Sequence, residues 1–152
     1  MHKELGKLVV WRRFSGVATF FRNSIDDVLR ERVDLSLSEV QLLIQIRSAG
    51  GSIRMVDIAQ ALRISKAGIT KMVGRLEQQG HVRRKASAED GRVRNVVLTT
   101  KGAKRLKKTR PHLSQWLGQH FTDVFNDQEL KTLNKAMLKL IEANQIQDPA
   151  DQ

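Results

Sequence analysis

The chain has 152 residues but no cysteine and no tyrosine, and only 5% of its residues are aromatic. The lack of cysteine excludes disulfides, thiolate metal sites and a cysteine-based redox switch. RNA-binding surfaces usually stack bases on aromatic side chains, and the gap between Phe21 and Trp116 holds none, which argues against RNA binding. No segment approaches the roughly 18 apolar residues of a membrane span, and the N-terminus is amphipathic, unlike a signal peptide. We therefore expect a cytoplasmic protein.

The patterns that mark common enzymes and metal sites are also missing. The sequence contains no glycine loop for a phosphate group and no nucleophile elbow. Its histidines are His2, His81, His112 and His120, and no two of them are spaced i, i+4 as metal ligands on one helix face would be. We therefore predict no enzymatic activity, no cofactor and no bound metal.

Positive charge is concentrated in one part of the chain, whose net charge is +11. Residues 63–110 hold fifteen Lys or Arg against three acids, a net of +12, whereas the remainder holds twelve bases and thirteen acids. A localised basic block on a folded segment is typical of a surface that binds a polyanion. The charge alone leaves open a second interpretation, a solvated face that serves solubility.

The N-terminal third predicts two helices and a short strand. Apolar side chains recur at steps of three and four over residues 5–33, which indicates one long helix with a bend near Ser15-Gly16. Ser36 and Glu39 have the spacing of a capping box and predict a second helix that ends at Gly50-Gly51. Residues 52–54 follow as a bridging strand.

Two short helices come next, over residues 56–62 and from Ser65 to Gly80. Only Arg63 and Ile64 join them, and a joint this short makes the helices cross steeply, as in a helix-turn-helix. Residues 82–86 and 93–98 then alternate with period two around an Asp-Gly bend, which predicts a hairpin.

Two further helices are expected after the hairpin. The first begins at Thr99-Thr100 and carries an apolar series as far as Phe121 and Val124, with Pro111 expected to kink or interrupt it. The second begins at a capping box over residues 126–129. The predicted fold is therefore mainly α (α+β), with a winged helix-turn-helix over residues 35–102 and a helical dimerisation region over residues 1–34 and 103–152.

The helix from Ser65 has the residues that major-groove recognition needs at its N-terminal end. They are small or flexible and include no acid: Ser65, Lys66, Ala67, Gly68, Thr70 and Lys71. Glycine inside a helix costs about 1 kcal/mol relative to alanine, so Gly68 indicates either close approach to DNA or packing against another helix. The hairpin adds further cations that contact a groove or, on the other interpretation, only solvate an edge: Arg83, Arg84, Lys85, Arg92 and Arg94.

From about Leu35 to Gly102 the chain resembles the MarR (multiple antibiotic resistance regulator) family of winged-helix proteins. The resemblance rests on Leu35-Ser36-Leu37, on Ile58-Ala59 followed by Ile64-Ser65, and on Val73-Gly74-Arg75-Leu76-Glu77 with Gly80. Its most specific part is Glu89-Asp90-Gly91-Arg92 followed by Val96-Val97-Leu98-Thr99 and Gly102. The resemblance implies a homodimer on palindromic double-stranded DNA, usually a repressor, often released by a small aromatic or phenolic ligand.

Carried over by position, the resemblance implies DNA contacts from the helix residues above and from Arg92, with Arg75 and Arg94 near phosphates. The chain departs from the family pattern at Arg63, where glycine is frequent in the turn, at Gly91 in the wing, and at Gly74 in place of an acid. A left-handed Arg63 would be mildly strained.

The terminal helices carry apolar stripes that a partner chain would cover, although pairing of the first and last helices within one chain is the alternative. Candidate effector-binding residues are Trp11, Phe14, Phe21, His112 and Trp116, which would serve equally as ordinary core. The basic run over residues 101–110 adds phosphate contacts or is a solvated helix face. A nonspecific architectural DNA-binding protein without a ligand is the alternative function.

Overall fold

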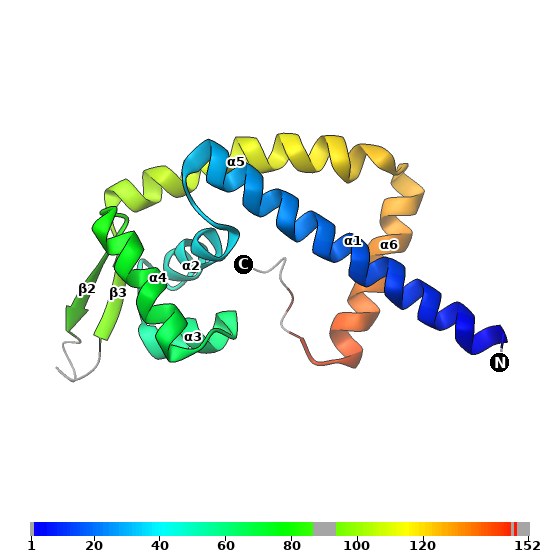
Figure 1. The fold of residues 1–152 in the computed structure, drawn as a ribbon, viewed down its shortest axis with the longest axis horizontal. Helices are drawn as coiled ribbons and strands as arrows, with labels where there is room; N and C mark the ends of the chain where they lie inside the picture. The colour runs from blue at the N-terminus through cyan, green and yellow to red at the C-terminus, as the bar shows by residue number, and fades with distance from the viewer. Residues whose placement is uncertain (1, 87–93, 147, 149–152) are drawn as a thin grey trace.

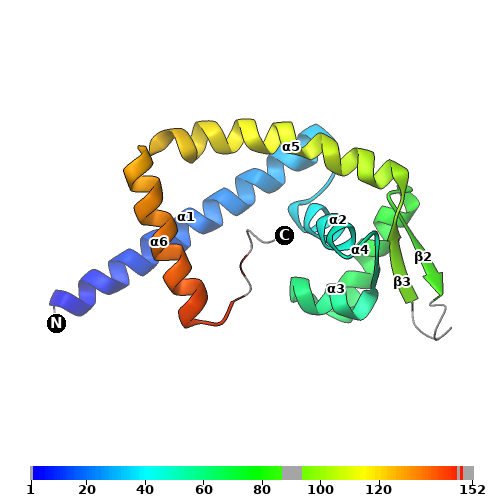
Figure 2. The same ribbon diagram turned by 180° about the vertical axis from the view of Figure 1, so that it is seen from behind.

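The computed structural model describes residues 2–86, 94–146 and 148. Six α-helices and a small sheet make up these residues (Figures 1 and 2). In chain order the elements are α1 (His2–Val33), α2 (Leu37–Ser48), β1 (Ser52–Arg54), α3 (Met55–Leu62), α4 (Lys66–Gln78), β2 (Val82–Ala86), β3 (Arg94–Leu98), α5 (Thr100–His120), a 3-10 turn (Thr122–Val124) and α6 (Asp127–Ala143). Within the described residues, no helix is long and apolar enough to cross a membrane.

The predicted order of helices and strands is confirmed, with one difference at the end of α5. Helix α1 is continuous through Ser15-Gly16, and α5 runs through Pro111 without interruption. Helix α5 ends at His120, so Phe121 and Val124 lie in the following turn and not in the helix. The chain turns there because Asn126 caps α6: its side chain accepts from the Glu129 amide, and Glu129 accepts from the Asn126 amide.

One hydrophobic core joins α2, α3, α4 and the sheet, and it extends into both long helices. Leu29 and Val33 at the end of α1 and Leu106 in α5 are buried in the same cluster as Leu43 and Leu76. The core of the winged domain is therefore completed by the end of α1 and the N-terminal half of α5. Figure 1 shows α5 passing along the top of this domain with α1 beneath it.

The junction between α1 and α2 is held by polar contacts. Asp34 adopts a left-handed conformation with φ 51°, and the predicted capping box joins Ser36 to Glu39. Asp26 accepts hydrogen bonds from the Leu37 amide and the Arg30 guanidinium, each at 2.6 Å. Burial alone would raise the pKa of Asp26, but these hydrogen bonds outweigh it and hold the pKa below its ordinary value.

The start of α5 is fastened to the turn between α4 and β2. The Thr99 hydroxyl caps the helix by accepting from the Gly102 amide and lies 2.7 Å from the Gly80 carbonyl, while the Thr99 amide donates to the His81 carbonyl. Gly102 faces that carbonyl so closely that a Cβ atom would overlap the His81 oxygen. A side chain is therefore excluded at position 102.

Candidate nucleic-acid interface

Helices α3 and α4 form the predicted helix-turn-helix. The turn depends on Arg63, whose φ of 52° and ψ of 42° place it in the left-handed region, as its position in the family pattern implies. Ser65 then caps α4 by accepting from the Gly68 amide at 3.1 Å. Ile69, Val73 and Leu76 bury one face of α4 in the core, which directs its N-terminal end outward.

The exposed end of α4 presents side chains that the sequence predicts to contact DNA. Ser65, Lys66, Ala67, Thr70 and Lys71 are all exposed. The Thr70 hydroxyl donates to the Lys66 carbonyl at 2.8 Å, so its oxygen remains available as an acceptor. No acid lies among residues 63–71, and the first turn of a helix carries partial positive charge. This surface suits the electronegative groups of a DNA groove.

A side chain at position 68 would clash with the residues just before α4. A Cβ atom there would lie 2.7 Å from Cγ2 of Ile64 and 3.2 Å from the Ser65 hydroxyl. Both groups belong to the turn that precedes α4. The glycine therefore accommodates the tight turn itself, and packing against a separate helix is not its role.

The three-stranded sheet forms the wing, with strand order β1-β3-β2 and antiparallel pairing throughout. Val82 and Val96 are buried, while Arg83, Lys85 and Arg94 are exposed. None of these three cations forms an ion pair within the part of the chain that the structure describes. Arg92, the predicted wing-tip residue, lies outside the described residues.

Two other cations of the basic block are engaged within the protein. Arg84 pairs with Glu77 at 3.3 Å and donates to the Thr70 carbonyl, which fixes the wing to α4. Arg75, which the sequence places near a phosphate, pairs with Asp34 at 3.3 Å and with buried Glu39 at 3.4 Å. No local pattern predicts these two partners, because Asp34 stands 41 positions away and the spacing of Glu39 from Ser36 already fits a capping box.

Arg105 is also engaged, since its guanidinium donates to the Val33 carbonyl at 3.2 Å across the junction of α5 and α1. Its replacement would therefore remove a contact between α5 and α1 as well as a surface charge. Exposed Arg94 is the better position at which to test a phosphate contact.

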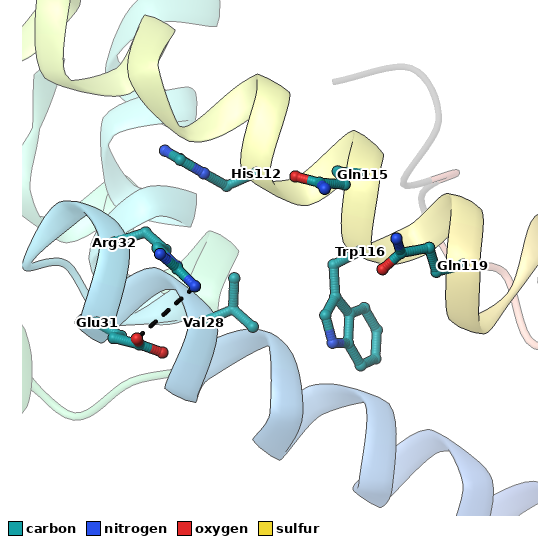
Figure 3. A pocket seen from close by; sticks show the side chains of 7 residues that line it. All are labelled: Val28, Glu31, Arg32, His112, Gln115, Trp116 and Gln119. Carbon is teal, nitrogen blue, oxygen red and sulfur yellow. Dashed lines mark ion pairs between the residues drawn. The ribbon is translucent and has the colours of Figure 1, made fainter.

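A cavity of about 400 Å³ lies between α1 and α5 (Figure 3). Of the five candidate effector residues, His112 and Trp116 line it, and the Phe21 ring packs edge-on against Trp116 with centroids 5.3 Å apart. Trp11 and Phe14 do not line the cavity but contact each other, and they are 61% and 43% exposed. Glu31 and Arg32 add charge at the cavity wall. The described residues include no group of three or more His, Asp or Glu placed to hold a metal ion.

Residues 33–93 match the MarR family. The matched residues run from the end of α1 through the helix-turn-helix into the wing. A HTH-type transcriptional regulator of Bacillus cereus is 29% identical over 118 residues, which cover 78% of each chain. The structure is similar to AbsC, a MarR family regulator of Streptomyces coelicolor, with a TM-score of 0.78, 26% identity, and coverage of 92% of this chain and 95% of AbsC. Sco3205 of the same organism, solved in complex with DNA, gives a TM-score of 0.79 and 26% identity over 90% of this chain and 86% of its own.

The protein is therefore a DNA-binding transcriptional regulator similar to those of the MarR family, and not an enzyme, with the winged helix-turn-helix fold that its sequence predicts. The basic block found in the sequence lies on the elements that characterise this fold, namely α4, the wing and the start of α5. Binding of DNA thus accounts for the positive charge on α4 and the wing.

His81 links the wing to the electrostatics of α5. Its side chain is buried, and its Nδ1 has no hydrogen-bond partner among the described residues. Burial lowers its pKa below the ordinary 6.5, helped by Arg105 and Lys101 and partly opposed by Asp34 and Glu39.

The unfolded chain therefore binds a proton at His81 more readily than the folded chain does. We expect the free energy of unfolding to hold above pH 6.5 and to fall as the pH drops through 6.5 toward the lower folded-state pKa. Urea unfolding at about pH 7.5 and about pH 5.5 should show a smaller loss in a His81→Gln variant. Equal losses in both proteins would remove His81 from the explanation.

Proposed function

We propose that this protein is a homodimeric repressor that binds a palindromic operator and is released by a small aromatic or phenolic effector. Residues 35–102 supply the DNA-binding domain, and residues 1–34 and 103–152 supply the dimerisation region. The observation that carries the proposal is the acid-free exposed end of α4 beside an exposed basic wing.

The exposed end of α4 enters the major groove in this proposal, and Lys66 and Lys71 reach base edges or phosphates there. Its contact residues are Ser65, Lys66, Ala67, Gly68, Thr70 and Lys71. Arg94 contacts the backbone and Arg92 an adjacent minor groove. Arg75 contacts a phosphate in this proposal only if its guanidinium gives up its ion pairs with Asp34 and Glu39 or binds the phosphate beside them. We therefore expect it to contribute less to DNA affinity than Arg94.

Unpartnered apolar surface supports the dimer. Helix α6 has no buried residue although its apolar side chains gather on one face, and α1 exposes Val10, Trp11 and Phe20 by 58% or more. Soluble monomers rarely leave apolar patches of this kind uncovered. The contact would be self-complementary, as in most twofold dimers.

Replacing Leu140 with glutamate should convert the dimer to a monomer. Leu140 is 46% exposed on the apolar face of α6, and a charge buried at an interface without a partner is strongly unfavourable. Light scattering after size-exclusion chromatography should give twice the chain mass of 17.3 kDa for the natural protein and that mass for the variant. Lys139→Glu alters the charge at the neighbouring position on the opposite face and should remain dimeric; a monomer there as well, or a dimeric Leu140→Glu, would contradict this interface.

The cavity between α1 and α5 supports the effector part of the proposal. A ring could stack near Trp116 while an acidic substituent faces Arg32 or His112. A ligand in the cavity would contact both α1 and α5. These two helices connect the DNA-binding domain to the dimerisation region, so a change in their spacing would alter the position of the DNA-binding domain. Fluorescence anisotropy of a bound duplex, titrated with a panel of phenols and aromatic acids, tests the release directly. Retention of the duplex throughout would favour a DNA-binding protein without a ligand.

A further inference from the structure

The basic run at the start of α5, residues 101–110, carries positive charge that the recognition of one operator does not use. Six of the ten residues from Lys101 to Arg110 are Lys or Arg, and no acid occurs between residues 91 and 122. Arg105 is engaged with the Val33 carbonyl. The other five are exposed: Lys101, Lys104, Lys107, Lys108 and Arg110.

These cations act against the stability of their own helix. Lys101 stands in the first turn of α5, where the helix dipole disfavours positive charge, and several of the five stand three or four residues apart, where like charges repel. None of the five forms an ion pair with residues 2–86, 94–146 or 148, although Arg30, Arg54 and Arg84 are all paired. An unfavourable and uncompensated arrangement indicates a ligand that supplies the missing negative charge.

The run lies far from the end of α4 that faces the operator. Lys101 is next to Gly80, with its Cδ and Nζ 3.6 and 3.7 Å from the place a Gly80 Cβ would take, beyond the C-terminal end of α4. The 13 residues of α4 span about 20 Å at 1.5 Å per residue. Figure 1 shows α5 beginning at this far end of α4, and Figure 2 shows the same arrangement from behind. We therefore expect a straight duplex docked at Ser65–Lys71 to leave the run free.

We propose that the five exposed cations of α5 form a second DNA-binding surface, which holds the phosphate backbone of a second duplex without reading its sequence. Lys101, Lys104 and Lys108 follow one face of the helix, and a duplex offers one negative charge per about 1.7 Å of its axis. The run contains no aromatic side chain on which single-stranded bases would stack. Its one large apolar residue, Leu106, is buried in the core, so the exposed face has no large apolar side chain to insert into a membrane. The regulator would thereby hold two DNA segments at once.

Two-colour capture of DNA tests this proposal with the full chain. A biotinylated duplex enriched from a random pool occupies α4, and a fluorescent duplex of unrelated sequence reports the second surface. The natural protein should retain the fluorescent duplex on the beads, with a steep loss as salt rises. The triple variant Lys104→Gln, Lys107→Gln, Lys108→Gln should retain about tenfold less of it, while its affinity and salt slope for the biotinylated duplex alone stay unchanged.

The matched control neutralises three exposed lysines of α6, at Lys131, Lys135 and Lys139, and should bridge as the natural protein does. Circular dichroism melting establishes that the triple variant is folded, and the single variants Lys104→Gln and Lys108→Gln should each lose part of the bridging.

Full bridging by the triple variant overturns the proposal, and so does an equal loss in the α6 control. A parallel loss of affinity for the biotinylated duplex would mean that α5 contacts the operator itself, and selective retention of RNA or anionic vesicles in place of the second duplex would assign another ligand; both also overturn it. Failure to enrich any sequence from the pool would count against sequence-specific recognition by α4. It would not count against the second surface, because bridging between two random duplexes would still be measured.

Discussion

Replacing Lys66 with alanine should weaken binding to the enriched operator by about 5- to 150-fold, equivalent to about 1–3 kcal/mol, and should relax the preference for one base pair. Lys66 is exposed in the first turn of α4, directly after the Ser65 cap, and has no ion-pair partner among the residues that the structure describes. Within the described residues, its ammonium group has no hydrogen-bond or ion-pair partner. The loss should therefore come from the complex and not from stability.

Arg94→Ala is the matched control for Lys66→Ala. Arg94 is exposed on β3 opposite Ala86 and is proposed to contact a phosphate. Its loss should weaken all sequences alike and flatten the dependence of log affinity on log salt by about one unit. Competition titrations of matched and single-base-changed duplexes, each over a range of salt, separate the two effects. The same phenotype in both variants would refute the division into base and phosphate contacts.

Replacing Gly102 with alanine should destabilise the fold by about 3 kcal/mol or more, because the added methyl overlaps the His81 carbonyl oxygen. The helix cannot move away easily, since Thr99 joins the start of α5 to Gly80 and His81 through its hydroxyl and amide. The effect should appear as a lower urea midpoint with an unchanged slope.

Gly74→Ala provides the control within another helix. A Cβ at position 74 would meet only the Arg84 guanidinium at 3.6 Å, an ordinary contact. Alanine there should raise stability by up to about 1 kcal/mol through helix propensity. Opposite signs for the two glycines would establish that close backbone approach and not helix propensity decides position 102, and a neutral Gly102→Ala would contradict the geometry.

Local sequence patterns predict most of the helix and strand boundaries. Capping boxes at Ser36 and Asn126, the cap at Ser65 and the short joint at Arg63 each depend on residues within four positions, so the sequence alone predicts them. The predicted end of α5 was wrong, because the apolar series continues through Phe121 while the helical backbone ends at His120. Hydrophobic spacing cannot reveal where a chain reverses between two helices.

The candidate site divides in the same way. Exposure of Lys66 and Lys71 follows from the helical period, but the ion pairs of Arg75 and the hydrogen bond of Arg105 join segments 36 to 72 positions apart. Such pairings depend on tertiary packing that no short motif encodes. For the same reason the sequence grouped five candidate effector residues, whereas only His112 and Trp116 line the cavity.

Selection of bound duplexes from a random DNA pool at about 0.15 M salt, followed by sequencing, tests the central claim most directly. A dimeric regulator that reads the major groove with α4 should enrich an inverted repeat whose half-sites lie about 10 base pairs apart, one helical turn. Enrichment of only A·T-rich or unrelated duplexes would contradict the account. It would mean that the basic surface binds DNA while α4 does not read it, and the nonspecific architectural function would then replace the one proposed.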